Sequence, residues 1–370
     1  LFAREGEQPS VAAPESKAAG DGQNAPLYDE SDPLQLEHMM GYSGAYRNLV
    51  HSVINNEDVF VKAMGNLVCL ENLMDPHDQK LLRGHDMNVS AVTMSPSGGL
   101  IASGQDGTVK YKGRAAPVFL WDTSTGQHLR TLQGLTVRVN CITFSLDERF
   151  VCACGEDCMM YLWDCTTGEV VLSQPFKSAV TTVAFTFQTR GRHYVTYDLM
   201  VGYGQLVAAG SLQYDPSRVQ WGLKITNFSV PSGGALMRSY TCCGVSTDHS
   251  SIYVGTTAGE LMVYRRDPPV YRACIPVCTA GVQSISVLPD DSVLCGGGDK
   301  TMKLLVGDGD MSWELRRECG LDGAVRSVSA MPNGTEALVA CTSGTIYRCL
   351  LSDFSNNVVG VGHTQAVSCM

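Results

Sequence analysis

Cysteine is the residue type with the greatest chemical potential in this 370-residue chain, which contains 15 of them. Four of them, Cys152, Cys154, Cys158 and Cys165, lie close in sequence, and Cys274 and Cys278 form another pair. Neither group contains the Cys-x-x-Cys pair that opens a zinc knuckle, so the spacing does not predict a metal site. Strand alternation places Cys152 and Cys154 on one face, as packing residues. We therefore expect buried, reduced thiols in a cytoplasmic protein, with no bound metal.

Sequence motifs for catalysis are missing. The chain has no Gly-x-Ser-x-Gly, no His-Glu-x-x-His and no Gly-x-x-x-x-Gly-Lys-Ser/Thr. The Gly-rich run 296–299 falls where a strand turns, and a positive φ explains it better than a phosphate site does. An enzyme with a metal or substrate in a central channel would need converging carboxylates and histidines, and the sequence offers no such set. We expect a non-enzymatic protein with no catalytic residue and no cofactor.

Charge and hydropathy exclude two further classes of protein. The net charge is −10, and residues 1–40, with 2 basic and 8 acidic side chains, account for −6 of it. The remaining 330 residues are nearly balanced, and dense coating of nucleic acid needs a basic face. No run of 18 or more apolar residues is present, so no segment is expected to span a membrane.

The elements that position these residues are predicted to be strands. Residues 1–34 are rich in Ala, Gly, Pro, Ser, Glu and Gln and hold few large apolar groups, which predicts a flexible acidic tail. After Gly41, apolar runs of four to seven residues alternate with clusters of Gly, Asp, Asn, Pro and Ser. No helix-length stretch keeps an apolar period of 3.6 residues. The pattern predicts an all-β domain over residues 35–370.

This domain repeats. Valines that open similar strands lie 41 residues apart at Val139 and Val180 and 43 apart at Val282 and Val325. A period of about 40–45 residues with four strands per unit is typical of WD-repeat propeller blades. We predict a seven-bladed β-propeller with a longer fourth blade. The expected blades are 41–83, 84–133, 134–176, 177–235, 236–278, 279–321 and 322–362. Two arrangements at the end of the ring are expected as alternatives. Either the last strand completes the ring, or the chain continues into a second propeller.

Two blades carry the marks of a WD hydrogen-bond network, in which a turn Asp orients a His and a Ser or Thr links it to a Trp indole. Gly84-His85 precedes one first strand, and Trp121 and Trp163 close two third strands 42 residues apart. Asp106 lies 15 residues before Trp121, which indicates an insertion in that turn. The predicted network residues are His85, Ser103, Asp106, Trp121, Asp122, Asp157, Trp163 and Asp164.

Basic loops are the candidate contacts for an acidic partner. Extra residues in a packed blade go to loops, and basic loops on a weakly acidic disc attract an acidic surface. The candidates are Lys110, Lys112 and Arg114 in one insertion, Arg190 and Arg192 in blade four, and the exposed pair Arg265 and Arg266. The alternative is that these side chains are only solvated, because charged runs usually are.

Several segments resemble the amino-terminal propeller of the cilia- and flagella-associated protein 52 family. They are Gly41-Tyr42-Ser43-Gly44, Leu82–His85 with Asn88–Ser90, Ile101–Gln105, Leu120–Asp122, Tyr253–Glu260, Thr345–Arg348 and Ser352–Phe354. The opening Gly-Tyr-x-Gly and the Ser-Gly-Gln blade are also similar to the echinoderm microtubule-associated family. The segments after residue 250 favour the ciliary family. The resemblance covers roughly residues 35–370.

The resemblance implies a structural protein of motile cilia and flagella. Members of that family carry two tandem propellers and are microtubule inner proteins of the axonemal doublet. They contact tubulin and inner-junction proteins such as enkurin and the Parkin co-regulated protein. On that expectation this chain is the first propeller, located in the cytoplasm and axonemal cytoskeleton, and the second lies beyond residue 370. The alternative is a general WD-repeat scaffold or a cytoplasmic microtubule-associated protein of the echinoderm type.

Overall fold

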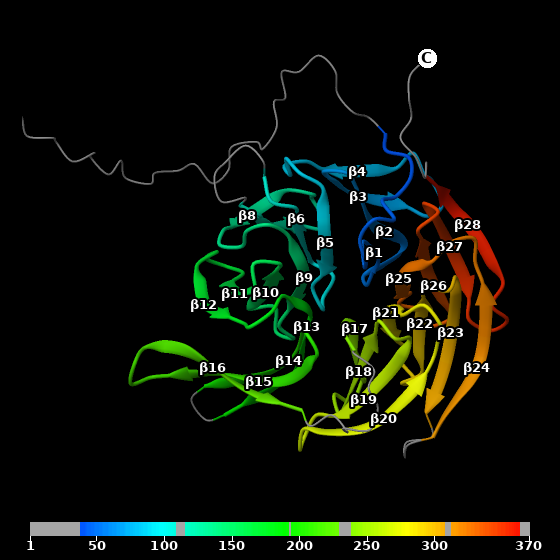
Figure 1. Cartoon of the computed structure of the whole chain (residues 1–370). Coiled ribbons are helices and arrows are strands. Elements are labelled where there is room, and N and C mark those ends of the chain that lie inside the picture. The colour runs from blue at the N-terminus through cyan, green and yellow to red at the C-terminus, as the bar shows by residue number, and fades with distance from the viewer. Residues whose placement is uncertain (1–37, 109–114, 192–193, 229–237, 308–311, 363–370) are drawn as a thin grey trace, which may run out of the picture.

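Seven four-stranded antiparallel sheets stand around a common axis (Figure 1). The structure is a computed structural model that describes residues 38–108, 115–191, 194–228, 238–307 and 312–362. Each sheet is built from four strands that are consecutive in the chain, and each lies within one of the predicted blades. The predicted all-β, seven-bladed propeller is confirmed. The predicted tail, residues 1–34, lies outside the described residues.

The strands of each blade run outwards from the axis in chain order. Blades one and two comprise β1 (Val50–Val53), β2 (Asn56–Met64), β3 (Leu67–Asn72), β4 (Gln79–Leu82), β5 (Val89–Met94), β6 (Leu100–Gln105), β7 (Val118–Asp122) and β8 (His128–Leu132). Blades three and four comprise β9 (Val139–Phe144), β10 (Phe150–Gly155), β11 (Met159–Asp164), β12 (Val170–Pro175), β13 (Val180–Arg190), β14 (Val195–Tyr203), β15 (Leu206–Asp215) and β16 (Gln220–Asn227).

The remaining three blades follow the same plan. They comprise β17 (Tyr240–Val245), β18 (Ser251–Thr256), β19 (Glu260–Arg265), β20 (Val270–Pro276), β21 (Val282–Val287), β22 (Val293–Gly297), β23 (Thr301–Gly307), β24 (Trp313–Gly320), β25 (Val325–Ala330), β26 (Glu336–Cys341), β27 (Thr345–Leu350) and β28 (Asn356–Val361). The innermost strands surround the axis, and the outermost strands form the rim (Figure 1).

The core lies between neighbouring blades, because each sheet is covered on both faces. In β10 every residue is buried. Phe150, Cys152 and Cys154 pack with apolar residues of blade four, whereas Val151 and Ala153 pack towards blade two. Alternation along a strand thus divides the side chains between two interfaces. Cys152 and Cys154 are packing residues on one strand face, as predicted.

The described ring closes without an exchanged strand. Blade seven contains four consecutive strands, and β1 packs against β25 and β26. Residues 39–48 form a segment, here called the latch, that lies against both end blades. A Cβ atom at Gly41 would lie 2.8 Å from the Gly362 Cα, and one at Gly44 would lie 2.8 Å from the Thr342 Cα. This close approach, together with a φ of +94° at Gly41, explains both glycines of the Gly41–Gly44 motif.

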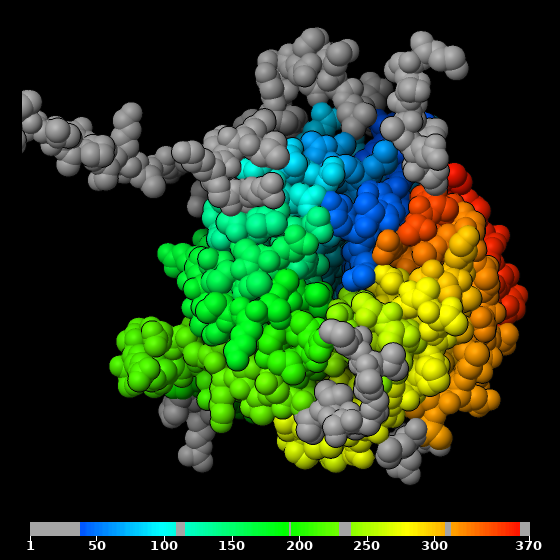
Figure 2. Space-filling model, in the orientation of Figure 1, coloured from blue at the N-terminus to red at the C-terminus, as the bar shows by residue number. Residues whose placement is uncertain are grey.

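The disc has two distinct faces. The face at which the innermost strands begin is here called the top face, and the face at which they end is the bottom face. Blade four departs from the regular disc, because β13, β14 and β15 have 11, 9 and 10 residues. Figure 2 shows the β15–β16 end of this blade, in green, projecting from the rim. The predicted irregularity of blade four is thus an extension of its sheet.

Candidate functional site

His85 is the centre of a buried chain of hydrogen bonds in blade two. The Trp121 indole Nε1 donates to the Ser103 Oγ at 2.7 Å, and the Ser103 hydroxyl donates to His85 Nε2 at 2.6 Å. This arrangement puts the imidazole proton on Nδ1, which donates to Gln105 Oε1 at 2.8 Å. Gln105 Nε2 then donates to a carboxylate oxygen of Asp86. All the donors of the chain therefore point in one direction, towards the negative charge of Asp86. Burial lowers the pKa of His85 to about 4.

Asp106 is not part of this chain, and the prediction that it orients His85 is wrong. Gln105 occupies that role, and Asp86 supplies the charge. The Asp106 carboxylate instead accepts a hydrogen bond from the Tyr46 hydroxyl and a bond of 2.8 Å from Arg138 Nε. The Asp106 carboxylate is thus directed at Tyr46 and Arg138 rather than at the imidazole.

Blade three lacks the network altogether. Leu135 occupies the place of His85, and Ala153 occupies the place of Ser103 on the second strand. Trp163 is fully buried, and its indole Nε1 donates to the carbonyl of Gln133 at 3.1 Å instead. Asp157, predicted to orient a His, accepts bonds from the backbone N and the hydroxyl of Thr136 at 2.7 and 2.9 Å. The predicted roles of Asp157 and Trp163 in a His-centred network are therefore wrong.

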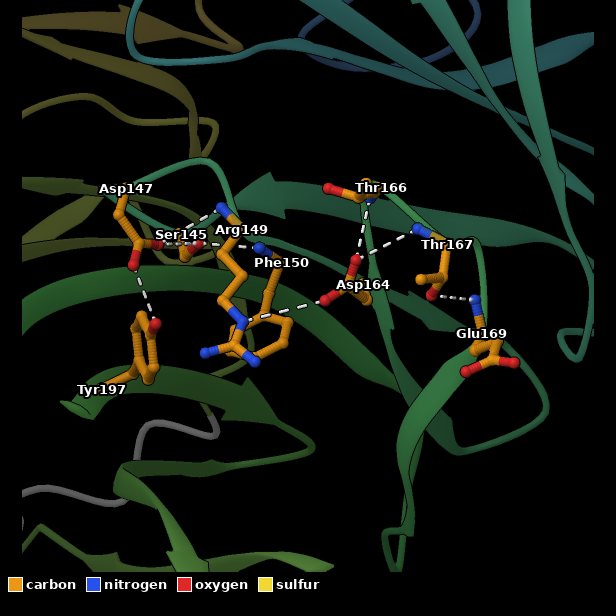
Figure 3. Close-up of polar contacts among 9 residues, drawn as sticks. All are labelled: Ser145, Asp147, Arg149, Phe150, Asp164, Thr166, Thr167, Glu169 and Tyr197. Carbon is orange, nitrogen blue, oxygen red and sulfur yellow. Dashed lines mark hydrogen bonds and ion pairs between the residues drawn. The ribbon is translucent and has the colours of Figure 1, made fainter. Parts of the chain in front are cut away.

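Asp122 and Asp164 stabilise equivalent turns on the bottom face. The carboxylate of Asp122 accepts bonds from Ser124 and Thr125, and these bonds lower its pKa. Asp164 accepts backbone bonds from Thr166 and Thr167 at 2.9 and 3.1 Å (Figure 3). These two carboxylates hold the turn after a third strand and have no part in the Trp network.

The Asp164 turn also belongs to the junction between blades three and four. Arg149 Nε lies 3.7 Å from an Asp164 oxygen, and the Tyr197 hydroxyl of blade four donates to Asp147 at 2.8 Å (Figure 3). The Arg149 guanidinium lies 5.5 Å from the ring centroid of Trp221, which comes from the outermost strand of blade four. These contacts fix the extended sheet of blade four against its neighbour.

The predicted basic contacts divide into three groups. Lys110, Lys112, Arg114 and Arg192 lie outside the described residues. Arg190, at the end of β13, and Arg265, at the end of β19, are exposed and lie on the bottom face of adjacent blades.

Arg266 was predicted to be exposed with Arg265, and this prediction is wrong. Its guanidinium pairs with Asp198 at 3.2 Å and lies 4.1 Å from the ring centroid of Phe187. Its Nε also donates to the carbonyl of His249 at 2.8 Å. Arg266 therefore joins blades four and five and serves the structure.

The top end of the central channel is a site that the sequence prediction missed. In blades two to seven the innermost strand carries a β-bulge at its second residue. All six bulged residues are polar: Ser90, Asn140, Thr181, Thr241, Gln283 and Arg326. The signal in the sequence was the polar residue that follows each opening valine or tyrosine. Bulges aim side chains away from the regular pleat, and here five of the six line one cavity.

Hydrogen bonds pass from blade to blade around this end of the channel. Ser90 Oγ donates to the Val139 carbonyl at 2.7 Å, and Asn140 Nδ2 donates to the Val180 carbonyl at 3.0 Å. Thr241 makes the same kind of bond to the first residue of β21. Three of the six bulged residues thus bond to the start of the next innermost strand, whereas the Thr181 hydroxyl donates to the carbonyl of Gly202 within its own blade at 3.3 Å.

The cavity inside this ring measures about 390 Å³. Arg138 lines one side and forms ion pairs with Asp106 at 2.8 Å and Glu156 at 3.0 Å. Burial, together with the hydrogen bond to Asp106, raises the pKa of Tyr46 to about 12. Arg47, Asn48 and Arg326 also line the cavity. The mouth therefore carries fixed charge of both signs, unequally distributed.

The cysteines of the described part of the chain are free thiols, which bears on their reactivity and on metal binding. Fourteen cysteines are free there, and burial raises the pKa of the Cys165 thiol to about 12, so it stays protonated. No group of three or more His, Cys, Asp or Glu side chains in the described ranges is placed to hold a metal ion. Within the same ranges no helix is long and apolar enough to cross a membrane.

Comparison with known sequences identifies repeats and long relatives. The profile of the WD domain, G-beta repeat, matches residues 77–111 and 126–164. Cilia- and flagella-associated protein 52 of Chlamydomonas reinhardtii is 24% identical over 350 residues, which cover 92% of this chain and 53% of that protein. The human protein of the same name is also 24% identical, over 90% of this chain and 52% of that protein. The chain thus spans about half the length of these relatives.

Two further comparisons show how widely the repeat and the fold are shared. Nuclear distribution protein PAC1 of Arthroderma benhamiae is 38% identical over 96 residues, which cover 25% of this chain and 21% of that protein. The β-propeller domain of Cps50 (Swd1) from Myceliophteria thermophila superposes with a TM-score of 0.56 at 15% identity. That match covers 73% of this chain and 85% of the domain, and it shows the fold alone.

Proposed function

We propose that this chain, a WD-repeat β-propeller, is a non-enzymatic structural protein of cilia and flagella. The supporting observation is its similarity, along 90% or more of its length, to cilia- and flagella-associated protein 52 from an alga and from mammals. We further propose the finer role, that of a microtubule inner protein in the axonemal doublet. There it binds tubulin and neighbouring inner-junction proteins.

The architecture suits a protein whose role is to be contacted. Blades buried on both faces make a stiff ring, so the loops of both faces keep fixed relative positions. Several weak contacts from such a ring add up when a lattice holds the partners at high local concentration. Because the relatives are about twice as long, we also propose that a second propeller follows this one in the intact protein.

Position inside the axoneme is the decisive test of this function. We would place the tagged chain in an electron cryo-microscopy map of isolated doublets and follow its extraction from axonemes with salt and detergent. The proposal expects density inside the doublet and retention in the insoluble axonemal fraction. Release with the soluble matrix contradicts an inner protein. Equal expression in cells without cilia favours the alternative, a general scaffold or cytoplasmic microtubule-associated protein.

The bottom face of blades four and five is the surface that we propose for tubulin. Arg190 and Arg265 are exposed there on adjacent blades, and tubulin is an acidic protein. The variant Arg190→Glu/Arg265→Glu should bind microtubules more weakly and with a smaller salt dependence in co-sedimentation. The matched control is Arg316→Glu/Arg317→Glu, which reverses two exposed charges on the outermost strand of blade six. Equal loss in both variants would mean that only net charge matters.

A further inference from the structure

Two arginines share one neutral acceptor at the top end of the channel. Arg47 Nε donates to Gln283 Oε1 at 2.7 Å, and Arg326 Nη1 donates to the same oxygen at 3.0 Å. Two donors on one amide oxygen fix the orientation of the Gln283 side chain. The guanidiniums of the latch and of blade seven are thereby held together, although like charges repel each other.

Neither of these arginines has a carboxylate partner within 4.0 Å among the described residues. Arg138, in the same cavity, has two, Asp106 and Glu156. The positive charge of Arg138 is therefore offset locally, whereas the charges of Arg47 and Arg326 are not. The side of the cavity that they form carries an excess of positive charge.

Both guanidiniums are partly removed from water, and their donors are not all used. The Nε atom of Arg326 is buried and has no hydrogen-bond partner in the described part of the protein. Burial and the nearby charge of Arg326 both lower the pKa of Arg47. Buried donors without partners are uncommon in proteins and need an explanation. A negatively charged acceptor would satisfy these donors and offset both charges.

The cavity has room for such an acceptor. Its volume of about 390 Å³ is that of a small-ligand site, and five of the six bulged residues line it. Asn48, which follows Arg47, accepts a bond from Ser284 at 2.7 Å, so the latch residue beside the arginine is itself held in place. The cationic side of the cavity is therefore preorganised.

We propose that Arg47 and Arg326 form an oxyanion-binding site at the top end of the channel, which takes the carboxylate or phosphate group of a small ligand. Guanidinium forks match the oxygens of either group, and binding would replace a neutral acceptor by a charged one. The site does not depend on the ciliary function proposed above, because only intramolecular geometry defines it.

Calorimetric titration of the whole chain tests the proposal. The probes are inorganic phosphate and glutarate, each at constant ionic strength maintained with chloride. We expect saturable binding with a Kd in the millimolar range, as suits a small anion held by two side chains. Saturation by phosphate alone, by glutarate alone or by both identifies the preferred group. No saturable heat with either probe would overturn the proposal.

Variants connect any binding to these residues. Arg47→Gln and Arg326→Gln should each weaken binding at least tenfold, whereas Arg316→Gln at the rim should change it less than twofold. Arg47→Lys keeps the positive charge and loses the fork of donors, so it should weaken binding severalfold. This variant keeps the test decisive if a neutral variant fails to fold. Thermal unfolding verifies that each variant is folded. Wild-type affinity in both glutamine variants would show that any bound anion lies elsewhere and would refute the site.

Discussion

Ser327 of the last blade and Val50 of the first form two hydrogen bonds across the junction that closes the ring. Val50 N lies 3.3 Å from the Ser327 Oγ, and the same hydroxyl donates to the Val50 carbonyl at 2.7 Å. A similar bond occurs two residues along β1, where the backbone N of Ser52 donates to the Ser329 Oγ at 3.0 Å. Hydroxyl groups and the latch thus connect two blades that share no strand.

Loss of the Ser327 hydroxyl should weaken this junction measurably. In Ser327→Ala the buried Val50 backbone N and carbonyl both lose their partner, which costs about 1–3 kcal/mol of unfolding free energy. Urea unfolding followed by circular dichroism measures the change. Ser217→Ala, which removes an exposed hydroxyl from a turn of blade four, is the control and should unfold as the wild type does. A Ser327→Ala protein with wild-type stability would mean that packing alone closes the ring.

Ser103 is the second position at which one hydroxyl matters. It accepts from Trp121 and donates to His85, so Ser103→Ala leaves two buried ring nitrogens without partners. We expect a loss of about 2–4 kcal/mol, larger than that of a single buried hydrogen bond. Thermal and urea unfolding report it. Ala153→Ser in blade three is the informative comparison, because Trp163 already donates to a carbonyl there, and it should bring no gain. Equal stability of Ser103→Ala and wild type would contradict the network.

Stability should fall in mild acid because His85 is buried in its neutral form. Its pKa is about 4 in the folded protein and about 6.5 when exposed, so below pH 6.5 the unfolded chain binds the extra proton. Stability is therefore complete above about pH 6.5 and declines towards pH 4, by up to about 3 kcal/mol. Burial lowers the pKa of His51 too, which acts in the same direction. Urea unfolding at several pH values should show a shallower decline for His85→Asn, and parallel curves would exclude His85 as a source.

The propeller was predictable because its physical requirements recur in every blade. Small residues on second strands allow the next blade to approach: a Cβ atom at Gly104 would lie 2.6 Å from Val139, and one at Gly296 would lie 2.4 Å from Val325. Selection for these contacts produces a period that can be counted along the chain. Buried Trp121 and Trp163 mark the same places in two blades.

The details of each site were less predictable because they depend on single side chains. Gln105 takes the role predicted for Asp106, which is one position further along the chain and close to an insertion. A repeat period does not distinguish between two neighbouring positions. Arg47 and Arg326 are 279 residues apart and meet only when the ring closes. Arg266 looked exposed because its partners, Asp198 and Phe187, belong to another blade. Sequence spacing reports contacts within a blade better than contacts between blades.

The latch is also held by a buried ion pair, and its energetics can be tested. The side chains of Lys62 and Glu71 are only 3% and 5% exposed and form a salt bridge. Lys62 Nζ also donates to the carbonyl of Met39 at 3.3 Å. Gln79 accepts a bond from the Met39 backbone N and donates to the Met39 carbonyl and to Glu71. Lys62→Met leaves the Glu71 carboxylate buried without its counter-charge, and the expected loss is about 3–5 kcal/mol.

Replacement of both charges separates the pair itself from the unpaired charge. Because desolvation offsets most of the attraction within a buried pair, Lys62→Met/Glu71→Leu should recover at least about 2 kcal/mol relative to Lys62→Met. Urea unfolding of the two variants gives the comparison. Arg218→Ala, which breaks the exposed pair with Asp215, should leave the unfolding free energy unchanged. If the double variant were no more stable than Lys62→Met, removal of the unpaired Glu71 charge would have recovered no stability. The attraction within the salt bridge itself would then hold the latch.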